Sequence, residues 1–169
     1  MMDDLDIQNY RLKLQERLEL NSTDIDALIA LGALEFEHFR NDKQAIELLE
    51  TAMKIDPKNI QAKFWLAMCL YYDCFEYAKA EKILQDALQL DPTRPECLSL
   101  MGQILRDLDK PVNETIQYVQ KALSYAPDWP MLRYQLAGLY VDIGEINAAE
   151  QEVKKALEIP EFNSGISRS

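Results

Sequence analysis

The sequence is poor in residues that interrupt regular structure or bind metals. Its 169 residues include only 5 glycines and 7 prolines, so we expect long elements joined by short connections. The single histidine, His38, and the cysteines Cys69, Cys74 and Cys97 lack the spacing of a zinc site or of a disulfide framework. We therefore expect reduced thiols in a cytoplasmic protein, with no metal and no cofactor.

Basic residues are outnumbered by acidic ones. Lys and Arg number 18 against 29 Asp and Glu, which gives a formal net charge of −11. Nucleic-acid binding is excluded on this ground, because it needs cations that neutralise phosphates. The acidic balance favours basic partners, although solubility alone also explains it. No apolar run approaches the ~20 residues that span a bilayer, so membrane insertion is not expected. The acidic start, residues 1–6, is unlike a secretory signal.

What the sequence does contain is a repeated string that ends in proline. Ala-Met-Lys-Ile-Asp-Pro at 52–57 returns as Ala-Leu-Gln-Leu-Asp-Pro at 87–92 and as Ala-Leu-Ser-Tyr-Ala-Pro at 122–127, with a shortened copy at 156–160. The first alanines of the four strings are 35, 35 and 34 residues apart. A small residue stands seven positions before each alanine, and a hydrophobic–small pair lies farther upstream. These are Ala45, Ala80, Thr115 and Ala149, and Leu31-Gly32, Leu66-Ala67, Met101-Gly102 and Leu136-Ala137.

The pattern predicts pairs of antiparallel helices. Small residues let two helix backbones approach closely, apolar residues at three- and four-residue spacing give each helix a buried face, and proline ends the second helix. Thr23, Asn59, Thr93 and Asp128 are the candidate N-cap residues. The expected helices are 3–20, 24–38, 43–55, 60–73, 76–90, 95–108, 111–125, 129–142 and 145–159.

The chain resembles the tetratricopeptide repeat, whose skeleton is Trp-x2-Leu-Gly-x2-Tyr, Ala-x3-Phe, Ala and Pro over about 34 residues. The Leu-Gly pair, the small residues and the closing proline are present or conservatively replaced. The resemblance implies an all-α fold, a right-handed α-solenoid of four helix pairs preceded by one N-terminal helix. The sequence departs from the skeleton at the tryptophan position, with Leu28, Lys63, Leu98 and Arg133, and at the tyrosine position, with Glu35, Leu70, Leu105 and Tyr140.

The repeat register also predicts the limits of each unit. The first three copies carry one residue more than the usual unit, which we place in the turn between their two helices. Residues 1–22 are expected to form a half-repeat that caps the first full one. The expected segments are then 23–59, 60–94, 95–129 and 130–160 for the four repeats, and 161–169 for a disordered tail.

In this family the first helices of the pairs line a concave surface that usually receives an extended peptide or a helix. In the second copy that surface carries an aromatic and methionine stripe, for which a core role and a binding role are equally good interpretations. The groove lacks the Lys, Arg and Asn of repeats that clamp the acidic C-terminus of heat-shock chaperones, so no such carboxylate clamp is expected. The expected partner-binding residues are Ile29, Phe36, Gln61, Phe64, Met68, Tyr71, Tyr72, Ser99, Gln103, Arg106 and Tyr134.

These observations favour a protein–protein interaction module, of adaptor or chaperone kind, that binds a peptide or helix in an apolar groove. No nucleotide loop, nucleophile elbow or metal motif suggests an enzyme. The alternative is a self-assembling scaffold that acts through its terminal faces. An apolar face around Leu139, Val153 and Leu157 would allow weak homo-oligomers, but shielding by Phe162 or simple exposure to water explains such residues as well.

Overall fold

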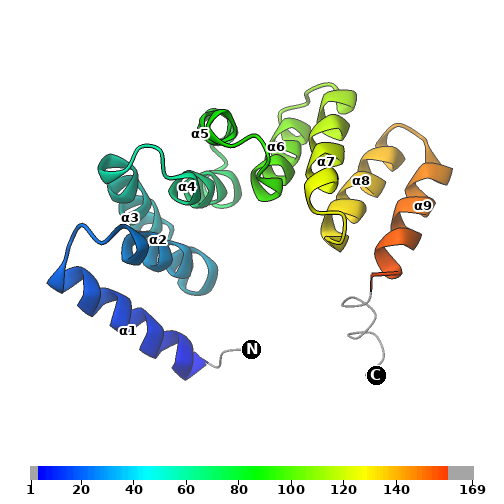
Figure 1. The fold of residues 1–169 in the computed structure, drawn as a ribbon. Helices are drawn as coiled ribbons and strands as arrows, with labels where there is room; N and C mark the ends of the chain where they lie inside the picture. The colour runs from blue at the N-terminus through cyan, green and yellow to red at the C-terminus, as the bar shows by residue number, and fades with distance from the viewer. Residues whose placement is uncertain (1–3, 160–169) are drawn as a thin grey trace. The chain divides into compact units, whose positions relative to one another are not determined.

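The computed structural model describes residues 4–159, and in that range all regular elements are helices, joined by short turns, with no strand. The predicted all-α fold of four helix pairs preceded by one N-terminal helix is confirmed (Figure 1). The chain divides into two compact units, residues 1–90 and 91–169, and the division falls between the second and third helix pairs. The proposed tail, 161–169, lies outside the described residues.

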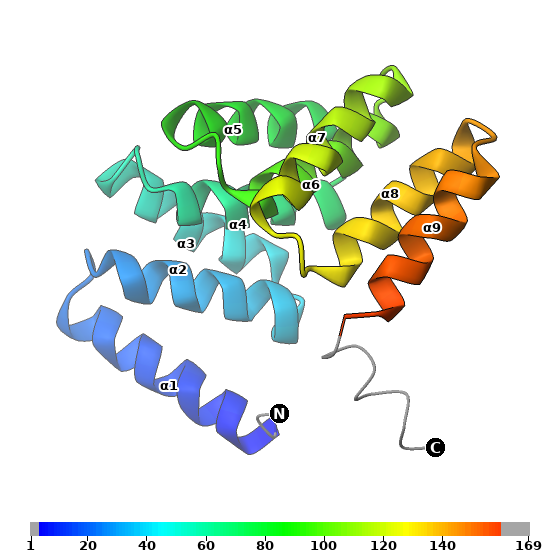
Figure 2. The same ribbon diagram turned by 45° about the vertical axis from the view of Figure 1, so that its right-hand side comes forward.

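The first unit contains one helix and two helix pairs. The N-terminal helix α1 packs on α2, whose last turn widens into the π-helical segment η1, and α2 pairs with α3 (Figure 2). Helix α4 packs on α3 and pairs with α5. The bounds are α1 Asp4–Leu20, α2 Ile25–Leu34, η1 Glu35–Phe39, α3 Asp42–Ile55, α4 Ile60–Tyr72 and α5 Tyr77–Leu90.

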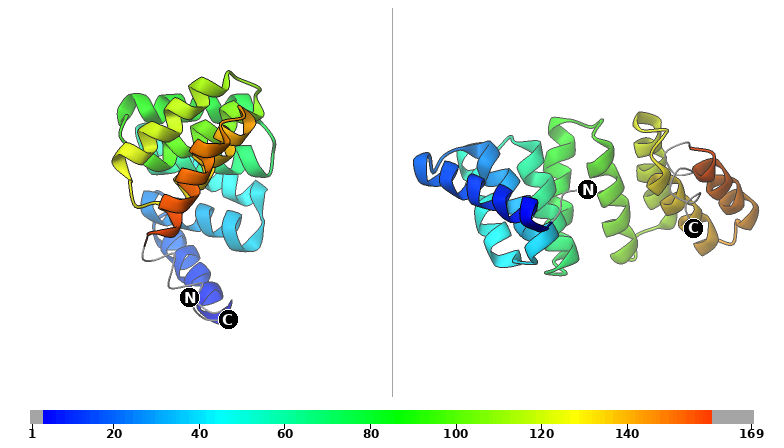
Figure 3. Two further views of the ribbon diagram at one scale, coloured as in Figure 1. Left: turned by 90° about the vertical axis from the view of Figure 1, so that its right-hand side faces the viewer. Right: turned by 90° about the horizontal axis from the view of Figure 1, so that it is seen from below.

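The second unit contains two further helix pairs. Helix α6 pairs with α7, α8 packs on α7, and α8 pairs with α9 (Figure 3). Both first helices begin with a proline, a position where the missing N–H has no partner in the helix anyway. The bounds are α6 Pro95–Asp107, α7 Val112–Tyr125, α8 Pro130–Asp142 and α9 Ile146–Leu157, each within two residues of the prediction.

The small residues that recur at the repeat spacing lie where the paired helices touch. Ala45 and Ala52 of α3 are fully buried. A Cβ added at Gly32 would lie 2.8 Å from Leu49 Cγ, and one added at Gly102 would lie 2.9 Å from Val119 Cγ2. The close approach of the helices therefore depends on the absence of a side chain at these glycines.

In each helix pair, the turn between the two helices contains one residue with a positive φ, in the left-handed region. These residues are Arg40, Phe75, Asp109 and Gly144. In the third and fourth pairs, the next N–H closes the turn by donating to the carbonyl oxygen five residues back, as in Lys110 to Leu105. In the first and second pairs the corresponding bond spans six residues, from Asn41 to Glu35 and from Glu76 to Leu70.

The extra residue of the first three copies therefore does not occupy one common place. In the first copy it widens the last turn of the first helix, which is why residues 35–39 are π-helical. The second copy has the same six-residue closure before Phe75. In the third copy the closure is ordinary, and the extra residue follows Asp109, ahead of helix α7.

Only some of the predicted N-caps cap a helix. Asn59 does, because its side chain accepts a hydrogen bond from the Ala62 N–H. The cap of α2 is Asp24, not the predicted Thr23, and it accepts from the Ala27 N–H. Thr93 bonds to the Asp91 carboxylate in the preceding turn. Arg94 and Trp129 stand at the N-cap positions of α6 and α8 in place of Thr93 and Asp128, without a capping side-chain bond.

Charged residues replace some aromatics of the family skeleton, and oppositely charged residues pair with them. Glu35, at a tyrosine position, is fully buried and is bound by Arg11 of α1 through Nε at 2.6 Å and Nη2 at 3.0 Å. Arg133, at a tryptophan position, donates to Glu152 of α9 at 3.0 Å. These pairs join α1 to the first repeat and α8 to α9, so the departures are compensated inside each unit.

Candidate functional site

The most distinctive surface of the first unit is a connected series of aromatic rings, which we call the aromatic cluster. Phe36 contacts Trp65 and Tyr72 with ring centroids 6.4 Å apart in both cases, and Trp65 contacts Phe64 at 5.5 Å. From Tyr72 the series continues to Tyr71, Tyr77 and Phe75. The cluster thus consists of Phe36, Phe64, Trp65, Tyr71, Tyr72, Phe75 and Tyr77.

Much of the aromatic cluster is open to solvent. Phe36 is buried, but Tyr72 is 44% exposed and Phe75 is 69% exposed. Phe75 also has a positive φ of 54°, a conformation that costs a non-glycine residue roughly 1–2 kcal/mol. A large apolar side chain is therefore held in water at a strained backbone position. The positive φ belongs to the turn between the paired helices, where Arg40 and Asp109 have it as well, so the exposure of the ring is the distinctive feature of Phe75.

The expected groove residues of the first unit differ in their exposure to solvent. Ile29 and Phe36 are buried, and Phe36 lies against rings of α4, so the second helix pair covers this part of the first. Gln61 is exposed, while Phe64 and Met68 are half-buried. Of the predicted residues in this unit, those on α4 remain at the surface.

In the second unit the expected residues do not share one surface. Ser99 is buried and donates a hydrogen bond to Gln135 Oε1 of α8 at 2.9 Å. Arg106 is exposed and pairs with Asp142 at 2.9 Å. Gln103 is half-buried on α6, whereas Tyr134 lines a groove between α8 and α9.

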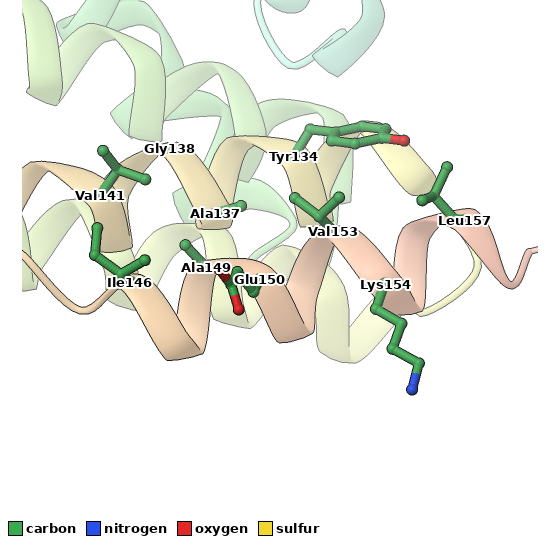
Figure 4. Close-up of a pocket in the computed structure, with 10 residues that line it drawn as sticks. All are labelled: Tyr134, Ala137, Gly138, Val141, Ile146, Ala149, Glu150, Val153, Lys154 and Leu157. Carbon is green, nitrogen blue, oxygen red and sulfur yellow. The ribbon is translucent and has the colours of Figure 1, made fainter.

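This α8–α9 groove encloses a volume of about 550 Å³. In Figure 4, Val153 projects from α9 toward α8, whereas Lys154 extends away from α8. Val153 and Leu157 lie in it as expected, but Leu139 does not, because it is buried against α7 with Ile116 and Val119. The groove is lined by Tyr134, Ala137, Gly138, Val141, Ile146, Ala149, Glu150, Val153, Lys154 and Leu157.

Two carboxylates meet at the edge of the first unit. Burial raises the pKa of Asp73 above its ordinary value, the negative charge of Asp42 raises it further, and Arg40 opposes both effects. Arg40 Nη2 donates to Asp73 Oδ1 at 2.9 Å. Neither Asp42 Oδ1 nor Asp73 Oδ2 accepts a hydrogen bond from a donor among the described residues. The pair therefore destabilises the fold when both carboxyls are ionised.

We expect the Asp42→Asn variant to be more stable than the parent chain by about 1 kcal/mol at neutral pH, because an amide N–H can donate to Asp73. A raised folded-state pKa means that the folded chain binds more protons. The stability from Asp73 is therefore fully present below about pH 4 and is lost as the pH rises through the raised pKa. Urea denaturation from pH 4 to pH 8 should show the variant's advantage growing with pH. An equal gain in Glu47→Gln, an exposed carboxylate of the same helix, would contradict this explanation.

The described residues offer little for catalysis or metal binding. Among residues 4–159 no group of three or more His, Cys, Asp and Glu side chains is placed to hold a metal ion. Burial raises the pKa of Cys69 and of Cys97 to about 12, so both thiols stay protonated at neutral pH. No helix in this range is long and apolar enough to cross a bilayer.

Sequence reasoning overlooked part of both surfaces. Phe75 and Tyr77 belong to the aromatic cluster, and their signal was the presence of four aromatic residues within residues 71–77. Ile146 of the α8–α9 groove was also overlooked, and it is 51% exposed. No feature of the sequence distinguishes it from a core residue, since it fits the apolar face of its helix.

Comparison with known proteins agrees with the repeat pattern. Two family models, both described as tetratricopeptide repeat, match residues 43–104 and 132–163, together more than half of the chain. The human "Interferon-induced protein with tetratricopeptide repeats 2" is 26% identical over 115 residues, covering 66% of this chain and 24% of that protein. The chain thus spans about a quarter of that relative's length.

Solved structures share the fold. MamA superposes with a TM-score of 0.77 at 20% identity, covering 98% of this chain and 99% of that one. YrrB, described as a tetratricopeptide repeat protein with an unusual peptide-binding site, gives a TM-score of 0.68 at 18% identity, covering 94% of this chain and 80% of that one. At these identities the likeness concerns the fold alone.

Proposed function

The chain belongs to the tetratricopeptide repeat family, and from this premise we propose that it is an adaptor or chaperone-like module that binds a segment of a partner protein on the aromatic cluster. Proteins of this family act as protein–protein interaction modules, which is the coarse function that the fold supports. The finer proposal rests on one observation: seven connected rings, of which Tyr72 and Phe75 stand well exposed.

Energetics support the aromatic cluster as a binding surface. Large aromatic side chains supply much apolar contact area for little loss of conformational freedom, and they dominate the binding energy of many interfaces. Met68, half-buried on the same helix as Phe64 and Tyr72, adds an adaptable contact. The proposed site therefore comprises Phe64, Met68, Tyr71 and Tyr72 of the predicted set, with Phe75 and Tyr77 added.

The proposal includes the setting of the module. We assign the repeats to residues 23–59, 60–94, 95–129 and 130–160. We also place the protein in the cytoplasm, which is consistent with three cysteines that are free thiols. The chain acts by binding, without catalysis. The residues that are buried, Ile29, Phe36 and Ser99, are left out of the binding surface.

We expect Tyr72→Ser and Phe75→Ser each to weaken partner binding by about tenfold or more, because a truncated anchor loses its buried area. Ligands would be selected from a displayed peptide library on the full chain, and their affinities measured by isothermal titration calorimetry. Tyr125→Ser is the matched control, since Tyr125 is a similarly exposed tyrosine of α7, outside the cluster. If the selected peptides bind all three variants equally well, the site lies elsewhere.

A further inference from the structure

The α8–α9 groove is an apolar surface that the proposed function does not use. Val141 and Ile146 at one end and Leu157 at the other are all exposed hydrophobic residues. Between them lie the small residues Ala137 and Gly138, which keep the floor of the groove open (Figure 4). Exposed apolar grooves of this kind mark interaction sites more often than isolated exposed residues do.

The preceding helix pair shows what fills such a groove. Ala137, Ala149 and Val153 repeat the register positions of Gly102, Thr115 and Val119, which are 34 or 35 residues earlier. At that earlier position the space is filled by a helix, because α8 lies against the α6–α7 pair.

Contacts of individual side chains show how α8 fills that space. A Cβ added at Gly102 would lie 3.3 Å from Gln135 Nε2, and Leu136 and Leu139 pack with Ile116 and Val119. The apolar side chains that α8 presents there are Leu136, Leu139 and Tyr140, so the equivalent surface on α8 and α9 has the shape that accepts a helix bearing apolar side chains one, three and four residues apart.

Charges around the α8–α9 groove select the kind of helix. Glu150 lines the groove, and Glu145 and Glu158 stand at the two ends of α9. None of the three has an ion-pair partner among residues 4–159, and Lys154 is the only cation that lines the groove in the described chain. The whole chain has a formal net charge of −11. A second copy of this chain would bring a like charge to the groove, so the electrostatics disfavour self-association and favour a basic partner.

We propose that the α8–α9 groove binds an amphipathic helix of a partner protein, with an apolar stripe that enters the groove and Lys or Arg residues beside the stripe. The composition of the segment that follows α9 in this sequence argues against it as the occupant. Residues 160–169 include Pro160, Ser164 and Gly165, which are poor helix formers, and only two large apolar residues, Phe162 and Ile166. This site is independent of the aromatic cluster, which lies in the other unit.

A synthetic helix tests the proposal. The probe is a fluorescein-labelled peptide of about 14 residues made of Leu and Lys, with the leucines spaced to form one stripe. Its binding to the full chain would be followed by fluorescence anisotropy. We expect Val153→Glu to weaken binding about tenfold, although the added negative charge attracts the peptide, because the charge would be buried under the stripe. Gln151→Glu adds the same charge on an exposed position of α9 and should not weaken binding.

Three further comparisons complete the test. A peptide with the same leucines and lysines in an order without a stripe, and one with Glu in place of Lys, should each bind at least about tenfold more weakly. Phe75→Ser, in the other unit, should leave the affinity of the striped peptide unchanged. Equal binding by Val153→Glu and Gln151→Glu, or a loss caused by Phe75→Ser, would overturn the proposal.

Two experimental outcomes would assign the groove to a different occupant. Sedimentation velocity is expected to show a monomer at all protein concentrations, and a dimer that Val153→Glu abolishes would assign the groove to a second copy. The double variant Phe162→Ser/Ile166→Ser is expected to bind the striped peptide like the parent chain. A tenfold gain in affinity in this variant would show that the following segment occupies the groove, and would overturn the proposal of a separate partner.

Discussion

Replacing Arg11 by Met is expected to lower the free energy of unfolding by about 3 kcal/mol, because it leaves a buried carboxylate without its cation. Glu35 has no exposed surface, and Arg11 binds both of its oxygens, at 2.6 Å and 3.0 Å. The guanidinium also lies 4.2 Å from the centre of the Phe39 ring. Since Arg11 itself is 26% exposed, water can partly screen the pair, and we place the loss at the lower end of the range for buried pairs.

Urea denaturation followed by circular dichroism measures the effect of Arg11→Met, and Arg17→Met is its control. Arg17 lies on the same helix and pairs with Asp24 at 2.8 Å, but its side chain is 51% exposed, so its loss should cost less than about 1 kcal/mol. Adding Glu35→Leu to the Arg11→Met chain should restore most of the stability, because no unpaired charge remains. Equal losses in the Arg11 and Arg17 variants would show that burial of Glu35 does not determine the cost.

The helices could be predicted from the sequence because their signals are local. Apolar spacing, small residues in step and a proline after each second helix all act within one repeat, and the predicted ends lie within two residues of the structure for most helices. Partners that lie far apart along the chain gave no such signal. Glu35 stood out as a departure from the family skeleton, but nothing in its spacing pointed to Arg11, which is 24 residues away in another helix.

The place of the extra residue shows the same limit. The sequence gives the length of each repeat but does not say which turn absorbs the added residue. That choice depends on which N–H closes the turn, and the structure makes it differently after Glu35 and after Leu105. The π-helical segment at 35–39 was therefore not predicted.

For the binding surface, sequence periodicity indicated the helix face on which each residue lies. It did not indicate whether a neighbouring helix buries that residue. The register placed Ile29 and Phe36 on the concave face of the first helix, yet both are buried, and the rings of Trp65 and Tyr72 on α4 lie against Phe36. Whether the following pair covers a position depends on how neighbouring repeats pack, which a helical wheel does not contain. Tyr72 was recognised because it lies on a helix, whereas Phe75 was missed because it lies in a turn.

Gly32→Val is expected to lower the free energy of unfolding by about 3 kcal/mol, through overpacking of the first helix pair. A Cβ at position 32 would lie 2.8 Å from Leu49 Cγ and 3.4 Å from the Ala45 carbonyl oxygen, and the two methyl groups of valine extend farther. Leu49 has little room to move, since it is fully buried. The helices of the pair would have to separate, at the cost of the contacts that join them.

Gly138→Val is the matched control, since Gly138 also lies inside a first helix, where the nearest atom to an added Cβ is Arg106 Nη1 at 3.9 Å. There, valine should be neutral or stabilising by about 0.5 kcal/mol, because it is a better helix former than glycine. Urea midpoints of the two variants would distinguish the two explanations. Helix propensity alone predicts a gain in stability at both glycines, whereas a steric requirement predicts a loss at Gly32 only. If Gly32→Val is as stable as the parent chain, the small residues that keep step along this sequence are not what sets the distance between its paired helices.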